Sequence, residues 1–174
     1  MIMKALNTLY KGNYFRSRTE ARWAVYFDAL GVEWEYEKQG YDLGDGVRYL
    51  PDFWFPKHNM FGEVKGDENI SDVDMDKMRR LVIQSKKDMC VFVGKPMKTI
   101  ITTITPSYNN PNDVNISYPD HVHDMGDLPF RDIVMGRKYE SGIYSCDSCL
   151  RNEEPFKSAL LKAQMTRFEH GAQP

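Results

Sequence analysis

The chain has 174 residues and a formal net charge of −2, with 41% hydrophobic, 13% aromatic and 28% charged residues. This length and composition fit one folded domain, with or without an appendage, and exclude a disordered chain. The charge gives no global signal for nucleic-acid binding, which would have to come from local clusters of Lys and Arg. No apolar run approaches the roughly 20 residues that span a bilayer, and the first residues lack the apolar stretch of a signal peptide, so we expect a cytoplasmic protein with no membrane partner.

The first predicted element is a helix from about residue 18 to residue 30. It begins at the sequence S-R-T-E, a capping box in which Ser17 accepts a hydrogen bond from the backbone near Glu20, and Glu20 bonds back to the Ser17 N–H. Apolar residues follow at helical spacing, and Gly31 is suited to end the helix. Glu20 lies on the apolar face of this helix.

The next part of the chain alternates strand and helix patterns. The predicted elements are two strands around a turn at 44–46, a strand over 61–66, a helix over 72–85, and strands over 89–93 and 99–105. Two glycines favour the hairpin turn, and an acidic first turn suits the helix dipole. The order helix, three strands, helix, strand predicts an α/β fold.

The last part of the chain is divided by composition. Residues 10–105 form the predicted core, and residues 106–152 are rich in Asn, Pro, Asp and Ser without a clear period, so we predict a loop-rich extension. Apolar residues then recur at helical spacing, which predicts a C-terminal helix within residues 153–171.

Three charged residues lie on two of the predicted strands, where a folding argument would prefer apolar side chains. Glu63 and Lys65 share one strand face because side chains two apart point the same way, and Asp52 converges with Glu63 if the two strands are neighbours. Two buried carboxylates repel unless protons or a cation compensate, and Mg²⁺ accepts such oxygen ligands and activates water for attack on phosphate. The pattern predicts a metal-dependent phosphodiesterase site; a surface salt bridge beside a strand bulge is the alternative.

These residues also carry a family resemblance. Pro51-Asp52 followed by Glu63-x-Lys65 resembles the signature of the PD-(D/E)XK nuclease superfamily. The longer segments FRSRTEARWAVYFDALGVEWEYE, YLPDFWFP, GEVKG and TRFEHG are similar to small phage and prophage nuclease-like proteins. The resemblance covers roughly residues 10 to 95 and the final helix. It implies a restriction-endonuclease-like core, α-β-β-β-α-β, with a central mixed sheet flanked by helices.

The resemblance implies specific roles at the site. Asp52 and Glu63 would bind Mg²⁺ or Mn²⁺, with the backbone carbonyl of Val64 as a further ligand, and Lys65 would be the catalytic lysine. Glu20 corresponds to the acid that many members add from the first helix. The capping box also explains Glu20 without catalysis, so both roles stay open.

The implied activity is that of a metal-dependent deoxyribonuclease that hydrolyses DNA phosphodiester bonds. A phage-encoded endonuclease would act in the host cytoplasm, in DNA processing or recombination. A non-catalytic nucleic-acid-binding or phage assembly protein that keeps the nuclease fold is the alternative, and RNA is a second substrate class to test. Cutting of both strands would favour a homodimer.

Basic side chains near the first helix are candidates for DNA contact. Arg16, Arg18 and Arg22 would bind phosphates without reading sequence, or would form a solvated helix face. Gln84, late in the second predicted helix, is comparable to a helix glutamine of some nucleases in this class, or is an exposed polar residue.

Two cysteines supply half of a zinc site. Cys146 and Cys149 are spaced C-x-x-C, and His121 and His123 are the better candidates for the remaining ligands. A structural Zn²⁺, a redox pair and a pair without a special role are all consistent with this spacing.

Overall fold

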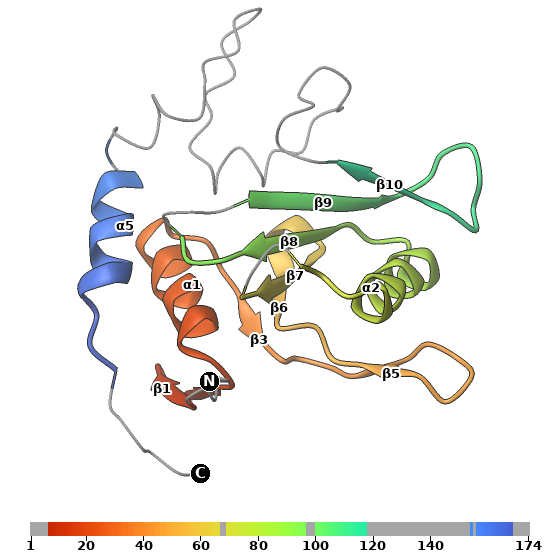
Figure 1. Ribbon diagram of the computed structural model, residues 1–174. Coiled ribbons are helices and arrows are strands. Elements are labelled where there is room, and N and C mark those ends of the chain that lie inside the picture. Colours follow the sequence, from red (N-terminus) through yellow and green to blue (C-terminus); the bar gives the residue numbers. More distant parts are fainter. Residues whose placement is uncertain (1–6, 67–68, 97–99, 118–153, 155, 169–174) are drawn as a thin grey trace, which may run out of the picture. The chain divides into compact units, whose positions relative to one another are not determined.

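The computed structural model describes residues 7–66, 69–96, 100–117, 154 and 156–168 (Figure 1). These residues form an α/β structure with a mixed six-stranded sheet and three α-helices. Their contacts divide them into two compact units. The predicted core, residues 10–105, contributes elements to both units. In the described part of the chain, no helix has the length and apolar character needed to span a membrane.

The first unit is built from a hairpin and two helices. Its elements are β1 (Thr8–Tyr10), β2 (Asn13–Phe15), α1 (Arg18–Ala29) and α5 (Phe156–Met165). The hairpin turns through Lys11 and Gly12, both at positive φ. α1 packs against α5, and the Arg22 guanidinium donates hydrogen bonds to the carbonyls of Ala163 (2.5 Å) and Gln164 (3.0 Å). Arg22 therefore satisfies two carbonyls at the C-terminal end of α5.

The second unit contains the central sheet, one helix and a separate ribbon. Its elements are β3 (Glu35–Tyr36), β4 (Tyr41–Asp42), β5 (Arg48–Tyr49), β6 (Phe53–Phe55), a 3₁₀ helix η1 (Pro56–His58), β7 (Met60–Lys65), α2 (Asp72–Ser85), β8 (Met89–Val93), β9 (Ile100–Pro106) and β10 (Val114–Ser117). The sheet order is β10-β9-β8-β7-β6-β3, with β4 and β5 paired apart from it. Only β7 and β8 pair in parallel among these strands, and α2 makes the crossover that a parallel pair requires.

One face of the sheet and α2 share a hydrophobic core. Its buried members include Phe61 on β7, Met89, Val91 and Val93 on β8, Ile104 on β9, and Met78, Leu81 and Val82 on α2. The ribbon adds Leu43, with Tyr41 and Tyr49 packed against the same core. Figure 1 shows α2 and the β5 arm of the ribbon extending from the sheet.

The opposite face of β7 is packed too closely for any side chain at Gly62. A Cβ at this position would lie 2.6 Å from a ring atom of Phe55 and 3.1 Å from atoms of Phe53 and Phe92. The rings of Phe53 and Phe55 are stacked, with centroids 6.1 Å apart. Aromatic packing therefore holds β7 from the face opposite to Glu63 and Lys65.

Most predicted elements are confirmed. α1, α2 and β8 occur where they were predicted, and β7, β9 and α5 match with shifts at their ends. The turn at 44–46 is also confirmed, but its strands form the separate ribbon, while β3 and β6 are the sheet strands before β7.

Two strand regions of the structure were not predicted from the sequence. β1 and β2 were not predicted, and the predicted loop-rich extension from residue 106 contains one strand that was not predicted, β10, which pairs with β9. β10 is an edge strand of four residues, Val114–Ser117, and its alternation of apolar and polar side chains is too short to identify a strand without its partner. Residues 118–153 of the predicted extension lie outside the described part of the chain.

Candidate active site

Strand pairing brings the two predicted acidic residues together. β6 and β7 are antiparallel with Phe53 opposite Gly62, so the next step along the register places Asp52 opposite Glu63. The Asp52 Oδ2 accepts a hydrogen bond from the Val64 N–H at 2.8 Å. Asp52 is 4% exposed and Glu63 is 6% exposed. The predicted adjacency of their strands is confirmed, and both carboxylates are buried.

Lys65 lies between Glu63 and an acid that the sequence did not reveal. Its Nζ is 2.9 Å from Glu63 Oε1 and 3.3 Å from Asp74 Oδ2. Burial lowers the pKa of Lys65, but the charges of Glu63 and Asp74 outweigh this effect, and the pKa lies above its usual value of 10.5. Lys65 is therefore a cation at neutral pH. Asp74 belongs to the first turn of α2, where its N–H donates to the Ser71 hydroxyl.

The negative charge of the same carboxylates also acts on a tyrosine that the sequence did not reveal. Burial raises the pKa of Tyr49 well above 10. The negative charge of Glu63 adds to this effect, and Asp52 and Asp74 contribute less. Tyr49 Oη and Glu63 Oε2 are both buried, and neither has a partner at hydrogen-bond geometry within the described residues. Tyr49 lies on the ribbon outside the sheet, so no strand spacing pointed to it.

The acidic side chains of this site are too few for a closed metal site but sufficient for a hydrated cation. The described part of the chain contains no group of three or more His, Cys, Asp and Glu side chains that could hold a metal ion. Mg²⁺ often takes only one or two carboxylates and keeps several waters. Buried Asp52 and Glu63, with an oxygen of Glu63 that has no hydrogen-bond partner among the described residues, fit such a cation better than a closed tetrahedral site.

Glu20 is held by the start of its own helix. The Ser17 hydroxyl accepts from the Glu20 N–H at 3.2 Å and donates to Glu20 Oε1 at 2.6 Å. Glu20 Oε2 accepts from the Arg16 N–H at 3.1 Å. The predicted cap by Ser17 is confirmed, and both oxygens of this carboxylate have local partners.

The predicted DNA-contacting arginines occupy different settings. Arg16 is exposed and Arg18 is half-buried, whereas Arg22 bonds to α5 and lies 5.7 Å from the ring centroid of Phe168. Gln84 is exposed and donates to the Asp42 carbonyl at 3.1 Å, which ties α2 to the ribbon.

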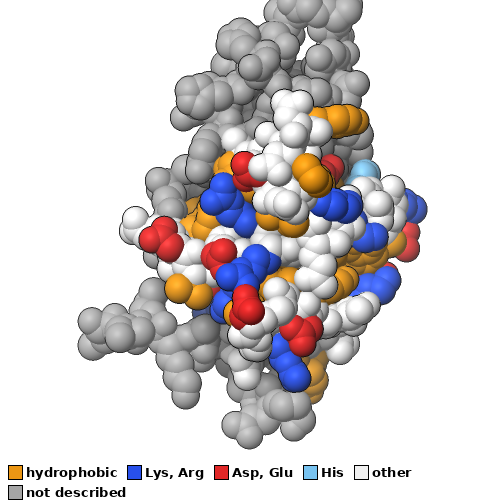
Figure 2. Space-filling model, turned by 90° about the vertical axis from the view of Figure 1, so that its right-hand side faces the viewer, with side chains coloured by type: hydrophobic (Ala, Val, Ile, Leu, Met, Phe, Trp, Pro, Cys, Tyr) orange, Lys and Arg blue, Asp and Glu red, His pale blue; other side chains and the backbone are white. Residues whose placement is uncertain are grey.

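Charges of both signs alternate on the face shown in Figure 2. Ion pairs on the second unit include Arg80 with Asp76 and Asp45, and Arg79 with Asp113.

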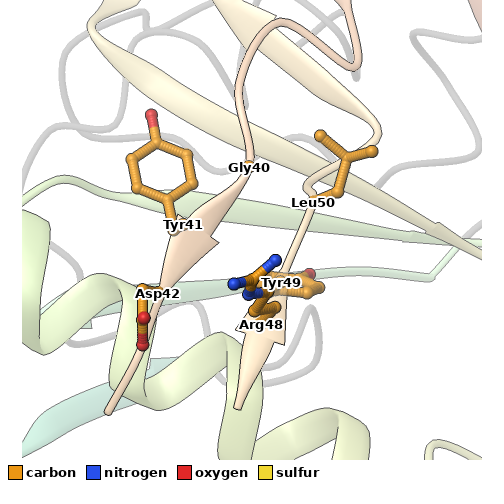
Figure 3. Close-up of a pocket in the computed structure, with 6 residues that line it drawn as sticks. All are labelled: Gly40, Tyr41, Asp42, Arg48, Tyr49 and Leu50. Atoms are coloured by element: carbon orange, nitrogen blue, oxygen red, sulfur yellow. The ribbon is translucent and has the colours of Figure 1, made fainter. Parts of the chain in front are cut away.

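An open cavity of about 400 Å³ lies on the ribbon (Figure 3). Its lining residues are Gly40, Tyr41, Asp42, Arg48, Tyr49 and Leu50.

The candidate zinc ligands Cys146, Cys149, His121 and His123 lie outside the described residues. Cys90 is buried on β8 and forms no disulfide within the described residues. Comparison of the chain with models of protein families, with curated proteins and with solved structures gave no match.

Proposed function

We propose that the chain is a metal-dependent deoxyribonuclease with a restriction-endonuclease-like core. The observation that carries this proposal is the setting of Glu63, a buried carboxylate with one oxygen on Lys65 and one without a partner in the described structure. Buried polar groups almost always have partners, and one that lacks a partner requires an explanation. A cation bound by Glu63 and the neighbouring Asp52 supplies that explanation.

A purely structural salt bridge accounts for less of the site. It explains the contact of Lys65 with Glu63 Oε1 but leaves Glu63 Oε2 and the burial of Asp52 unexplained. When the separate ribbon of β4 and β5 is set aside, the order α1-β3-β6-β7-α2-β8 agrees with the α-β-β-β-α-β order that the family resemblance implies. Both points support the proposal.

Each residue has a defined role in the proposed reaction. Asp52 and Glu63 would hold Mg²⁺ or Mn²⁺, with the Val64 carbonyl as a further ligand, and the metal would lower the pKa of a bound water and polarise a phosphate oxygen. Lys65 remains protonated and has three donors, so it can orient the attacking water or stabilise charge on the phosphate while it contacts Glu63 and Asp74.

The proposed partners of the chain are DNA and a second copy of the same chain. DNA would be the substrate, in the host cytoplasm if the chain is phage-encoded, and Arg16 and Arg18 would contact its phosphates. A homodimer would supply two sites for cutting both strands.

The test is cleavage of a panel of supercoiled, linear, single-stranded and branched DNA, and RNA, with Mg²⁺ or Mn²⁺. Asp52→Asn keeps an oxygen that accepts from the Val64 N–H but removes the charge, and should abolish cleavage. Asp76→Asn, on the surface of α2, is the matched control and should keep it. Metal-dependent binding without cleavage of any substrate would favour the non-catalytic nucleic-acid-binding or assembly protein.

A further inference from the structure

The sheet face that carries the candidate site also carries aromatic rings. On β7, Phe61 shares a face with Glu63 and Lys65, because side chains two apart point the same way. Two rings contact Phe61: Trp54 of β6, with centroids 5.1 Å apart, and Tyr41 of the ribbon, with centroids 5.4 Å apart. Phe61 is 1% exposed, whereas Trp54 and Tyr41 are half-buried. The face with the carboxylates therefore continues into two partly accessible aromatic side chains.

Two lysines from distant parts of the chain gather at the Trp54 ring. The Nζ of Lys38, after β3, lies 5.7 Å from the ring centroid, and the Nζ of Lys87, before β8, lies 5.1 Å from it. Lys38 also pairs with Glu35, whereas Lys87 donates to the neutral amide oxygen of Asn59. A tryptophan ring attracts a cation but has no net charge to neutralise it. The charge of Lys87 is therefore not compensated by a carboxylate in the described part of the chain.

A third cation borders the cavity on the ribbon. Arg48 is exposed and lies opposite Asp42 in the register of β4 and β5, but Asp42 Oδ1 accepts from the Gly44 N–H at 2.9 Å. The Arg48 side chain forms no hydrogen bond or ion pair with the described residues. Arg48 and Tyr41, on the two arms of the ribbon, both line the open cavity of about 400 Å³ (Figure 3). Sites for small ligands measure about 300–1,000 Å³, so the cavity has the size of a site for one nucleotide.

An unpaired strand of nucleic acid is the occupant that uses both the rings and the cations. Proteins bind single strands by stacking bases on aromatic side chains while Lys and Arg contact the phosphates. In a duplex the faces of the bases are stacked inside and are not accessible to Trp54 or Tyr41. An acidic polypeptide would compensate the cations but would leave the rings and the cavity unused. The net charge of −2 gives no general attraction for polyanions, so recognition would depend on this local combination.

We propose that Lys38, Tyr41, Arg48, Trp54 and Lys87, which we call the basic aromatic surface, bind an unpaired strand of nucleic acid beside the candidate site. All five residues belong to the second unit. The substrate would then carry a single-stranded segment, such as a flap or a branch arm, next to the bond that is cut. This statement about the substrate rests on the proposed function, whereas binding of the strand to the surface does not.

The first experiment measures binding without metal, in EDTA and at several salt concentrations. It uses the fluorescence anisotropy of a labelled oligothymidylate and of a duplex of the same length, and the single strand should bind more tightly. Arg48→Gln and Lys87→Gln should each reduce the slope of log K against log salt by about 0.7. Lys86→Gln is the matched control and should keep the wild-type slope, because Lys86 is exposed and its Nζ donates to the Pro111 carbonyl. Tighter binding of the duplex, wild-type slopes in both variants, or equal binding of poly-glutamate would overturn the proposal.

The role of the rings is tested in the same assay. Tyr41→Leu should weaken binding of the single strand roughly 5–150-fold, whereas Tyr108→Leu, at an exposed tyrosine of the second unit, should leave it unchanged. Equal Kd values for Tyr41→Leu and wild type would overturn the stacking. If Tyr41→Leu does not fold, photo-crosslinking of a 5-bromouracil strand to wild type replaces it: a crosslink at Tyr41 or Trp54 is expected, and crosslinks only elsewhere overturn the assignment.

The second experiment adds Mg²⁺ and compares cleavage of a duplex that carries a single-stranded flap with cleavage of the blunt duplex. Wild type should prefer the flapped DNA, and Arg48→Gln should reduce this preference mainly through KM. Equal cleavage of the two by wild type would overturn the statement about the substrate. If neither DNA is cleaved, the proposed function fails and with it that statement, while the metal-free binding still decides the role of the basic aromatic surface.

Discussion

Glu20 and Glu63 are both buried glutamates, 8% and 6% exposed, but their surroundings differ. Both oxygens of Glu20 accept hydrogen bonds at the start of α1, from the Ser17 hydroxyl and the Arg16 N–H. Glu63 has Lys65 on one oxygen and no partner on the other within the described residues. Burial of a carboxylate alone therefore does not identify a functional site; the oxygen that folding leaves without a partner does so better.

The largest effect on this comparison should come from removing Lys65, a cation that contacts Glu63. Lys65→Met leaves a buried carboxylate without a charged partner, and we expect a loss of about 1–3 kcal/mol in the free energy of unfolding, measured with urea at pH 7. Adding Glu63→Gln removes the buried charge and should recover part of this loss. A double variant no more stable than Lys65→Met would contradict the account of Glu63 as an uncompensated charge.

The same pair should also make stability depend on alkaline pH. The pKa of Lys65 is raised in the folded state, so its stabilisation is present below about pH 10.5 and is lost as the pH rises through the folded-state pKa. The loss of stability between pH 9 and pH 12 should be smaller in Lys65→Met than in wild type. Equal pH profiles would show that Lys65 is not bound by the two carboxylates.

The next effect concerns the strand that positions Glu63. Gly62→Ala places a Cβ 2.6 Å from the Phe55 ring, and we expect destabilisation of about 1–3 kcal/mol. Gly66→Ala is the matched control, since a Cβ there meets nothing within 4 Å, and it should have little effect. Similar denaturant midpoints for the two variants would show that β7 is not held by this aromatic packing.

A smaller effect is expected at the helix start that satisfies Glu20. Ser17→Ala removes the helix cap and a donor to Glu20, at a cost of about 0.5–2 kcal/mol. Ser71→Ala removes the corresponding cap of α2 and tests whether the added contact with Glu20 matters. Ser17→Ala should be the more destabilising variant in thermal or urea unfolding. The opposite order would remove the basis for treating Glu20 as structurally satisfied.

The smallest effect should come from the second acid on Lys65. The Asp74 side chain is 41% exposed and its contact with Lys65 is 3.3 Å, so Asp74→Asn should cost about 0.2–1 kcal/mol. Asp76→Asn, which breaks the exposed pair with Arg80, provides the scale for a surface ion pair. A loss well above 1 kcal/mol for Asp74→Asn would mean that Asp74, rather than Glu63, is the main partner of Lys65.

The sequence predicted the elements whose signals are local. α1 and α2 begin at the serine caps Ser17 and Ser71, and β8 is a continuous apolar run, so each could be located from its own residues. The hairpin β1–β2 and the edge strand β10 have short, partly polar sequences. Their stability depends on pairing partners, which a single pass along the chain does not reveal.

The candidate site follows the same division. Asp52, Glu63 and Lys65 were found because strand periodicity and one pairing place them together. Tyr49 and Asp74 were not found, because the ribbon and α2 bring them to the site only in the folded structure. Arg22 was predicted to contact DNA. In the structure its guanidinium donates a hydrogen bond to the Ala163 carbonyl, 141 residues away in the chain, and no local sequence signal indicates this contact.

The most direct test of the central claim is the effect of Mg²⁺ on thermal unfolding of wild type, Glu63→Gln and Glu35→Gln, the last at a surface glutamate paired with Lys38. At about 100 times its Kd, Mg²⁺ should stabilise wild type and Glu35→Gln by about 2.7 kcal/mol, or roughly 5–10 °C in Tm, and should have little effect on Glu63→Gln. An equal rise in all three proteins, or none in wild type, would contradict the assignment of Glu63 as a metal ligand.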